Sequence, residues 1–529
     1  MRVSTPFHLS RRAFLASTAV TAGLSALPFR PARAAAKYRR YNVASAEGQK
    51  ALASYAKGVE AMLNLPADSP QNWFRNAFIH LLDCPHGNWW FFVWHRGYLG
   101  YFEQTIRTLS KDDTFALPYW DWTQSPQIPA GMFDGVLDPT FKAYEPYTGT
   151  FDAFSGFIKP TMEKYWASLS TAQQAQQRAR GNKTFQDFWN MVTGNGVAGD
   201  EAFAVTARAR YLSRDNPKLD ADTTKAVSPD TVRDGLAVTD FYNEDVTKSF
   251  TSSKTTSHNS PPAKFSILEH YPHNLVHNCI GGVGPWDNGP YGNMTNFLSP
   301  VDPIFFLHHA NMDRLWDVWT NKQQAAGLPI LPPADLLATL SKQPFLFYVD
   351  GGGNYVGDSS KAGDYLSTDR FGYDYEPGFG SDIKAGTAVA SNAVPRTFKG
   401  SLKNKAVTLA LPHAAVENHQ AAPLARLVAE ITVARPDKGG REFTVLVNAP
   451  PGVTEAAPDS PYYGGIIAFF GPAMPGMAMD MTFTVPLPKT LQAFTQLGAG
   501  NADLNIRLVP AHGKAGPVPT LKALTVKSL

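Results

Sequence analysis

The fold is decided by residues 302–316, which read DPIFFLHHANMDRLW. Asp302 is a favourable N-cap and Pro303 suits the first position of a helix, so a helix is predicted to begin here and to run to about residue 320. At helical spacing, one inward stripe contains Phe305, His309, Met312, Trp316 and Trp319. His309 is therefore expected to point into the core, while His308 is rotated by about 100° from it.

An imidazole buried among large aromatic side chains needs a partner, because an unpaired buried polar group costs on the order of 1–3 kcal/mol. A hydrogen bond or a metal ion would serve. A second helix, expected over residues 272–280 with Pro272 at its start, carries His273 and His277 four residues apart on one face. Such a pair can chelate one ion, and His309 would add a third imidazole.

The first part of the chain repeats this arrangement. Helices are expected within residues 47–110, and His95 shares a stripe with Leu99, Phe102 and Ile106. His80 comes from the preceding helix and His86 from the loop between the two. Six neutral imidazoles without a carboxylate ligand suit copper better than calcium, magnesium or manganese, which prefer oxygen ligands. The sequence thus predicts a pair of three-histidine sites, most plausibly a dicopper site, in a helical bundle.

Composition narrows the class of protein and the partners it could bind. The chain has 529 residues, of which 43% are hydrophobic and 18% charged, which is typical of globular proteins and excludes bulk disorder. A balance of 48 basic and 45 acidic residues gives no reason to expect nucleic acid or an anionic membrane as a partner. Two cysteines, Cys84 and Cys279, exclude a disulfide framework and a cysteine-based zinc site.

The N-terminus has the features of an export signal. Ser10-Arg11-Arg12 is followed by an uncharged apolar stretch that ends at Phe29, and Ala32-Arg33-Ala34 supplies a cleavage site. We expect residues 1–34 to be a twin-arginine signal peptide of a bacterial protein that is periplasmic or secreted. The alternative is an uncleaved membrane anchor. No other run is long enough to cross a bilayer, so no integral membrane contact is expected after cleavage.

The character of the chain changes after residue 377. We expect a catalytic domain over residues 35–377, a linker with one or two strands over residues 378–424 and a β-rich domain over residues 425–529. Period-two patterns predict strands at residues 427–433, 443–447, 465–470, 481–485, 504–509 and 521–526. The predicted fold class is mainly α, a helical bundle followed by a small antiparallel sandwich or barrel.

The motifs around the histidines resemble the two copper signatures of the tyrosinase family. This family of type-3 copper proteins includes tyrosinases, catechol oxidases and molluscan haemocyanins. The resemblance rests on Trp94-His95-Arg96-x-Tyr98-Leu99 and on residues 302–316, and it covers roughly residues 41–377. Tyr373-x-Tyr375 looks like the family marker for the end of the catalytic domain. The resemblance to the family implies that one copper is bound by His80, His86 and His95, and the other by His273, His277 and His309.

The resemblance implies further roles near the copper ions. Cys84 and His86 match a pair that some members join by a thioether, the alternative being a free buried thiol. Phe305 resembles an aromatic residue that packs over the copper pair. Catalytic roles fall on Glu269, which would hold a water, and on Asn274, which would help to polarise it so that a monophenol can be deprotonated. The alternative for Glu269 is a cap of the helix at Pro272.

Other positions are expected to line the pocket or to support the ligands. Asn296 falls at the gate position of the family, with Phe297 beside it, and His308 lies next to a ligand. Asp313 is expected to orient ligand imidazoles. The C-terminal part is weakly similar to the extra domain of plant and fungal members, which inserts one side chain into the copper pocket. Residues 471–481 are the candidate covering loop; their four methionines suit a transient copper(I) site or plain hydrophobic packing.

Together these features predict a tyrosinase that uses O2 to hydroxylate small monophenols and to oxidise the resulting o-diphenols to o-quinones. Three alternatives stay open: a catechol oxidase without monophenolase activity, a haemocyanin-like oxygen carrier, and a latent proenzyme that is activated by cleavage within residues 378–424. The oligomeric state is left open, a homo-oligomer included.

Overall fold

The computed structural model describes residues 36–145, 150–192, 208–259, 264–287, 289–383, 396–403, 406–422, 425–436, 439–471, 480–496 and 502–529. The expected signal peptide and most of the methionine-containing loop lie outside these ranges. Contacts group Tyr38–Leu529 into one compact unit, so the domain boundaries at residues 377 and 425 stay predictions. None of the helices in the described part of the chain combines the length and apolar character that a bilayer crossing requires.

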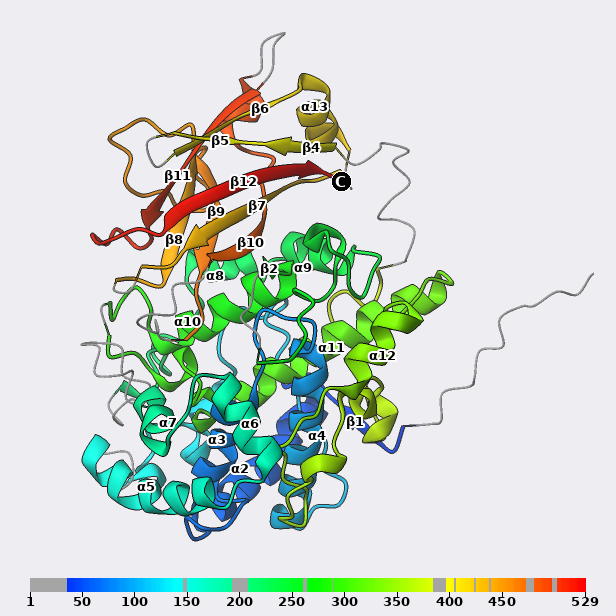
Figure 1. Cartoon of the computed structure of the whole chain (residues 1–529), viewed down its shortest axis with the longest axis vertical. Helices are drawn as coiled ribbons and strands as arrows, with labels where there is room; N and C mark the ends of the chain where they lie inside the picture. The colour runs from blue at the N-terminus through cyan, green and yellow to red at the C-terminus, as the bar shows by residue number, and fades with distance from the viewer. Residues whose placement is uncertain are drawn as a thin grey trace, which may run out of the picture. The chain divides into compact units, whose positions relative to one another are not determined.

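Helices dominate the first two thirds of this unit (Figure 1). The central helices are α2 (Ala46–Leu63), α3 (Trp73–Asp83), α4 (Phe91–Ser110), α10 (Leu275–Gly281) and α11 (Ile304–Ala325). Around them lie α5 (Phe151–Ala167), α6 (Thr171–Ala179), α7 (Phe185–Val192), α8 (Ala221–Ala226), α9 (Pro229–Leu236) and α12 (Ala334–Lys342). Helix α11 begins one residue later than predicted, with Pro303 at the N-cap position, and Asp302 Oδ1 accepts a hydrogen bond of 3.1 Å from the Ile304 amide.

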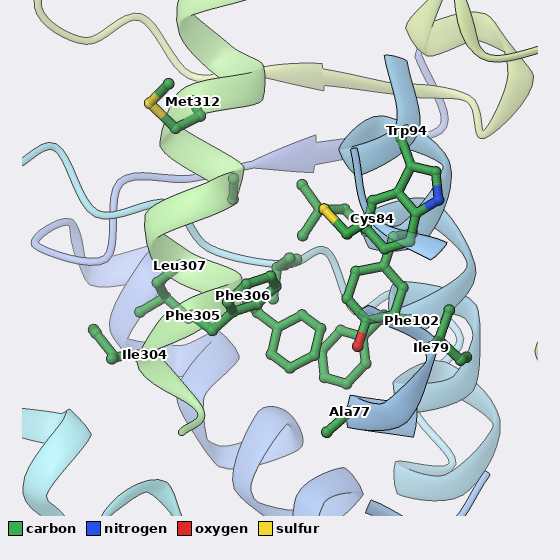
Figure 2. Packing of buried hydrophobic residues seen from close by; sticks show 14 of the residues in the cluster. Ala77, Ile79, Cys84, Trp94, Phe102, Ile304, Phe305, Phe306, Leu307 and Met312 are labelled. Atoms are coloured by element: carbon green, nitrogen blue, oxygen red, sulfur yellow. The ribbon is translucent and has the colours of Figure 1, made fainter. Parts of the chain in front are cut away.

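Aromatic side chains fill the contact between α4 and α11. The rings of Phe102 and Phe306 stack with centroids 3.4 Å apart, and Trp73 of α3 lies edge-on to Phe102 at 6.2 Å. Figure 2 shows Phe305 and Phe306 pointing from α11 toward the side chains of the facing helices. Both phenylalanines are fully buried, so the copper-motif helix is held against α3 and α4 by large apolar surfaces.

Asp313 joins α11 to the chain ends of the helical part. Its Oδ1 accepts from Arg96 at 2.7 Å and its Oδ2 from Tyr373 and Tyr375 at 2.5 and 2.6 Å. Arg40 donates to the same oxygen at 3.3 Å. Burial alone would raise the pKa of Asp313, but Arg96 and Arg40 hold it below its usual value. The expectation that Asp313 orients a ligand imidazole is wrong, since these arginines and tyrosines occupy its carboxylate.

Strands near both ends of the helical part lie next to Asp313. Strand β1 (Tyr38–Arg40) pairs in parallel with β3 (Tyr373–Tyr375). Arg40 and Tyr375 are partners in this ladder, and both contact Asp313. The Tyr373-x-Tyr375 motif therefore closes the helical part by fixing its last strand to its first.

The C-terminal region folds into two five-stranded sheets that share one core (Figure 1). Its strands are β4 (Arg396–Lys399), β5 (Ser401–Lys403), β6 (Ala406–Leu411), β7 (Leu427–Ala434), β8 (Glu442–Val447), β9 (Tyr463–Ala468), β10 (Asp480–Pro486), β11 (Ala502–Pro510) and β12 (Thr520–Ser528). The sheet orders are β2-β10-β7-β12-β4 and β5-β6-β11-β8-β9. All six predicted strands are present, and the predicted fold class is confirmed.

The region predicted as a linker is more ordered than expected. It contains β4, β5, β6 and the helix α13 (His413–Ala421), rather than one or two strands. In β6 the side chains of Val407, Leu409 and Leu411 are buried while the residues between them face outward, which is the period-two pattern of a sheet with one covered face.

One strand of the C-terminal sheets comes from the helical part of the chain. Strand β2 (Lys264–Phe265) pairs in parallel with β10, with Phe265 opposite Phe483. The Thr484 hydroxyl of β10 also donates to the Phe265 carbonyl at 2.7 Å. The chain passes directly from β2 into the segment that carries His273 and His277, so this segment and the C-terminal sheets are built against each other.

Candidate metal centre

Two groups of side chains, all buried except the half-buried His86, could each hold a metal ion. The first contains His80 of α3, Cys84 and His86 of the following loop, and His95 of α4. The second contains His273, His277, His308 and His309 from α10, α11 and the turn before α10. Within each group the candidate ligand atoms lie within 4.8 Å of one another. The rings of His95 and His309 stack with centroids 4.1 Å apart, so both groups line one site.

Main-chain carbonyls fix the orientation of three of these imidazoles. The Nδ1 atoms of His80, His95 and His277 lie 2.8, 2.8 and 2.6 Å from the carbonyl oxygens of Phe297, Phe91 and Met294. A carbonyl can only accept, so Nδ1 carries the proton and Nε2 keeps its lone pair. His273 is held in the same way, with Nδ1 at 2.8 Å from Asn274 Oδ1.

The free ring nitrogens converge as metal ligands would. The Nε2 atoms of His277 and His309 are 3.1 Å apart, and those of His80 and His273 are buried with no hydrogen-bond partner. Burial lowers the pKa of both His80 and His273 to about 3, so their rings stay neutral. Buried lone pairs without donors are what a metal ion would satisfy, and the residues present therefore fit a copper pair.

His308 is built differently from its neighbour His309. The Trp122 indole nitrogen donates to His308 Nδ1 at 3.2 Å, so the proton of the neutral ring lies on Nε2. His308 thus presents an N–H group at the atom where a ligand needs a lone pair. The assignment of His309 rather than His308 as the ligand stays a prediction.

Cys84 lies against two of the imidazoles. Its sulfur is 3.8 Å from His86 Nε2 and 3.4 Å from His95 Nε2, and burial raises the pKa of the thiol. The thioether itself stays a prediction. Cys279 is buried in α10, as expected for a small core residue.

The segment before α10 differs from the predicted helix. Residues Glu269–Asn274 form a π-helical turn, and the regular helix begins only at Leu275. Pro272 lies inside this turn and has no amide proton, so it cannot make the hydrogen bond that a regular helix requires there. His273 and His277 still face the same site, with ring centroids 4.6 Å apart.

Glu269 and Asn274 have separate partners. The Glu269 carboxylate accepts from the Gly87 amide and the Ser252 hydroxyl, both at 2.5 Å, so it does not cap the helix and that alternative is wrong. Burial raises the pKa of Glu269 to about 8, against the effect of these two donors. Asn274 accepts from His273 and donates to the Ala468 carbonyl at 2.9 Å.

Two of the remaining predicted residues pack against the imidazoles. Phe305 packs its ring 4.2 Å from that of His309 and 5.2 Å from that of His80, as expected of an aromatic cover. Phe297 lies 5.9 Å from His86 by ring centroids. Within the described residues, Asn296 makes no hydrogen bond to an imidazole. Its Oδ1 accepts instead from the Leu298 amide.

Sequence reasoning missed the residue that covers the site. Phe470, two residues after the end of β9, places its ring centroid 4.7 Å from that of His86, 4.8 Å from that of His277 and 5.5 Å from that of His273. The predicted cover began one residue later, at Gly471, and Phe470 was assigned to a strand. The signal for it is the pair Phe469-Phe470 at the end of a buried strand and immediately before Gly471-Pro472.

The fold and the site define a helical protein with a dinuclear metal centre built on imidazoles. Residues 54–322 match the family model for the common central domain of tyrosinase, and the chain belongs to the tyrosinase family. Polyphenol oxidase II of Ipomoea batatas is 26% identical over 342 residues, which are 61% of this chain and 47% of that protein. Catechol oxidase B of Solanum tuberosum is 27% identical over 63% of this chain and 48% of its own length. The chain spans about half the length of these curated relatives.

Solved structures share the fold of the whole unit. A latent aurone synthase superposes with a TM-score of 0.54 at 20% identity, covering 94% of this chain and 89% of that chain. A latent apple tyrosinase gives 0.51 at 20% identity, over 94% and 96% of the two chains. The common fold is a helical central domain followed by an antiparallel β-rich region.

Proposed function

We propose that this protein is a polyphenol oxidase with two copper ions, one bound by His80, His86 and His95 and the other by His273, His277 and His309. The observation that carries the proposal is the set of Nε2 atoms of His80, His95, His273 and His277, which keep their lone pairs because the Nδ1 proton of each ring is hydrogen-bonded elsewhere. When bound, the copper pair supplies the activation of O2 and accepts electrons from the phenol. The neutral state of the six imidazoles makes them available as ligands without loss of protons.

The substrate class follows from the side chain that now fills the site. The planar ring of Phe470 lies against His277 and His86, beside the ring of Phe297. A small phenol presents a ring of the same size and could take this position once Phe470 moves. In the complete reaction, one monophenol and one O2 give one o-quinone and one water through the o-diphenol.

We further propose that monophenols are hydroxylated, rather than o-diphenols alone being oxidised. Glu269, four residues before His273, would take the phenol proton, and its raised pKa suits a base that works near neutral pH. Asn274 would keep His273 in the orientation that leaves Nε2 free. The alternative is a catechol oxidase, for which Glu269 would be structural.

Separate assays with a monophenol and an o-diphenol test this assignment. Assayed with two copper ions per chain verified in each variant, Glu269→Gln and Asn274→Gly should lower monophenol conversion about tenfold or more while o-diphenol oxidation falls much less. An equal fall of both activities would reject the selective role. Reversible oxygen binding without quinone formation, even in a variant with an open site, would instead support an oxygen carrier of the haemocyanin type.

Export is a further proposal. The twin-arginine pattern of residues 10–15 would direct a folded, copper-containing bacterial protein to the periplasm or the medium. N-terminal sequencing of the exported protein should give a start near residue 35, and a start at residue 1 would reject cleavage.

A further inference from the structure

Three polar side chains at intervals of four residues face the C-terminal sheets from the segment that carries His273 and His277. They are His270, Asn274 and Asn278, and all three are buried. The adjoining face carries His273 and His277, also four residues apart, which belong to the candidate metal centre. One segment thus presents its ligands on one side and a row of hydrogen-bonding groups on the other.

This polar row occupies the open edge of β9. Among the described residues, strand β9 is the last strand of its sheet and pairs with β8 alone. The Ala468 amide donates to His270 Nε2 at 3.2 Å, and the Ala468 carbonyl accepts from Asn274 Nδ2 at 2.9 Å. Two side chains therefore supply the acceptor and the donor that a neighbouring strand would provide.

The row continues along both sides of this contact. Asn278 Nδ2 donates to the Phe469 carbonyl at 3.2 Å and to Glu442 of β8 at 2.9 Å. His270 Nδ1 lies 3.2 Å from the Thr484 carbonyl of β10, so the same ring joins β9 and β10. Separation of the C-terminal sheets from this segment would break all of these hydrogen bonds together.

Through Asn274, the strand end reaches a ligand. The amide nitrogen of Asn274 is held by Ala468, which turns its oxygen toward His273 Nδ1. That contact fixes the proton on Nδ1 and leaves the lone pair of Nε2 facing the site. Phe470, two residues after Ala468, covers the same site.

We propose that the end of β9 is a structural part of the second copper site, because Ala468 positions the Asn274 amide and thereby His273. The polar row of His270, Asn274 and Asn278 also keeps β9 attached to the helical part when the chain is cut before the C-terminal sheets. Attachment does not depend on copper, whereas the role of Asn274 as a positioning residue rests on the proposed dicopper function.

Attachment is tested on the full chain with a specific protease site inserted between residues 383 and 396. After cutting, the two pieces should co-elute in size-exclusion chromatography without denaturant; separation into two peaks would overturn the proposal. In Asn278→Leu the pieces should separate at a lower urea concentration than in the cut parent. Asn182→Leu is the matched control, because this buried asparagine bonds Gln177 instead. Separation of the pieces at the same urea concentration in Asn278→Leu and Asn182→Leu would reject the role of the polar row in attachment. If Asn278→Leu does not fold, Asn278→Ser replaces it.

Positioning of His273 is tested by competition between the uncut chain and a copper chelator. Asn274→Leu should bind one of its two copper ions at least about tenfold more weakly, whereas Asn278→Leu should bind both nearly as the parent does. If Asn274→Leu binds both copper ions as tightly as the parent does, Asn274 does not position His273. Fewer than two copper ions in the parent would contradict the proposed function instead, and would leave the attachment result standing.

Discussion

The ring of Phe470 lies 4.8 Å from the ring of His277, between the C-terminal sheets and the candidate copper centre. It also contacts His86, so one side chain lies against both histidine groups. A phenol that approached His277 would meet this ring first. The structure therefore has the contacts of a covered site, and removing the cover has a measurable consequence.

Phe470→Ala should increase the rate of o-diphenol oxidation. Loss of the phenyl ring uncovers the space beside His86 and His277. A rate increase of about tenfold corresponds to an activation free energy that is lower by roughly 1.4 kcal/mol. Initial rates at low substrate concentration measure it. Phe398→Ala is the control, because Phe398 packs against the C-terminal core away from the histidines. An unchanged rate in Phe470→Ala, with copper content intact, would show that Phe470 does not limit access.

Copper content distinguishes the two adjacent histidines of α11. His308→Gln should retain two copper ions per chain, because the proton of His308 lies on the atom that would have to bind. His309→Gln should lose one ion. Metal analysis after dialysis against a weak chelator measures both, and loss of an ion only from His308→Gln would reverse the assignment.

Asp313→Asn should destabilise the helical part strongly. The substitution leaves Arg40 and Arg96 buried without their carboxylate, and breaking such a pair costs about 3–5 kcal/mol. The urea midpoint of the far-ultraviolet circular dichroism signal should fall accordingly. Asp374→Asn, which breaks the exposed Arg39–Asp374 pair in the same ladder, should cost less than about 1 kcal/mol. Similar midpoints for the two variants would contradict the role of Asp313.

The contact of Glu442 with His512 predicts a loss of stability at alkaline pH. Burial lowers the pKa of His512, but its 2.6 Å contact with Glu442 raises it to about 9. A raised folded-state pKa means that the stabilisation is complete below the unfolded value and is lost as the pH rises through about 9. The loss between pH 7.5 and about pH 10 should be about 1–2 kcal/mol.

His512→Gln provides the comparison for this effect, since it removes the charge and keeps a polar side chain. The difference in urea midpoint between parent and variant should shrink as the pH rises. A difference that stays constant or grows between these two pH values would contradict the linkage.

The helical part could be predicted closely because its signals are local. Asp302 and Pro303 mark the start of α11, and helical spacing alone separated His309 from His308. The six strands of the C-terminal sheets follow from period-two patterns for the same reason. The π-helical turn at Glu269–Asn274 could not be predicted, because Pro272 also suits the start of a regular helix.

Contacts between distant segments were beyond sequence reasoning. Strand β2 has only two residues, too few for a periodic signal, and it forms only against β10. The partners of Asp313, 217 residues from Arg96 and 60 from Tyr373, depend on the assembled fold. The cover was expected in residues 471–481, whereas Phe470 reaches the site because β9 ends at Ala468.

The most direct test is anomalous diffraction at the copper edge from crystals of the copper-loaded protein. The account predicts two peaks in one site, the first bound by Nε2 of His80, His86 and His95, and the second by Nε2 of His273, His277 and His309. A single peak, or a peak bound by His308 in place of His309, would contradict the account.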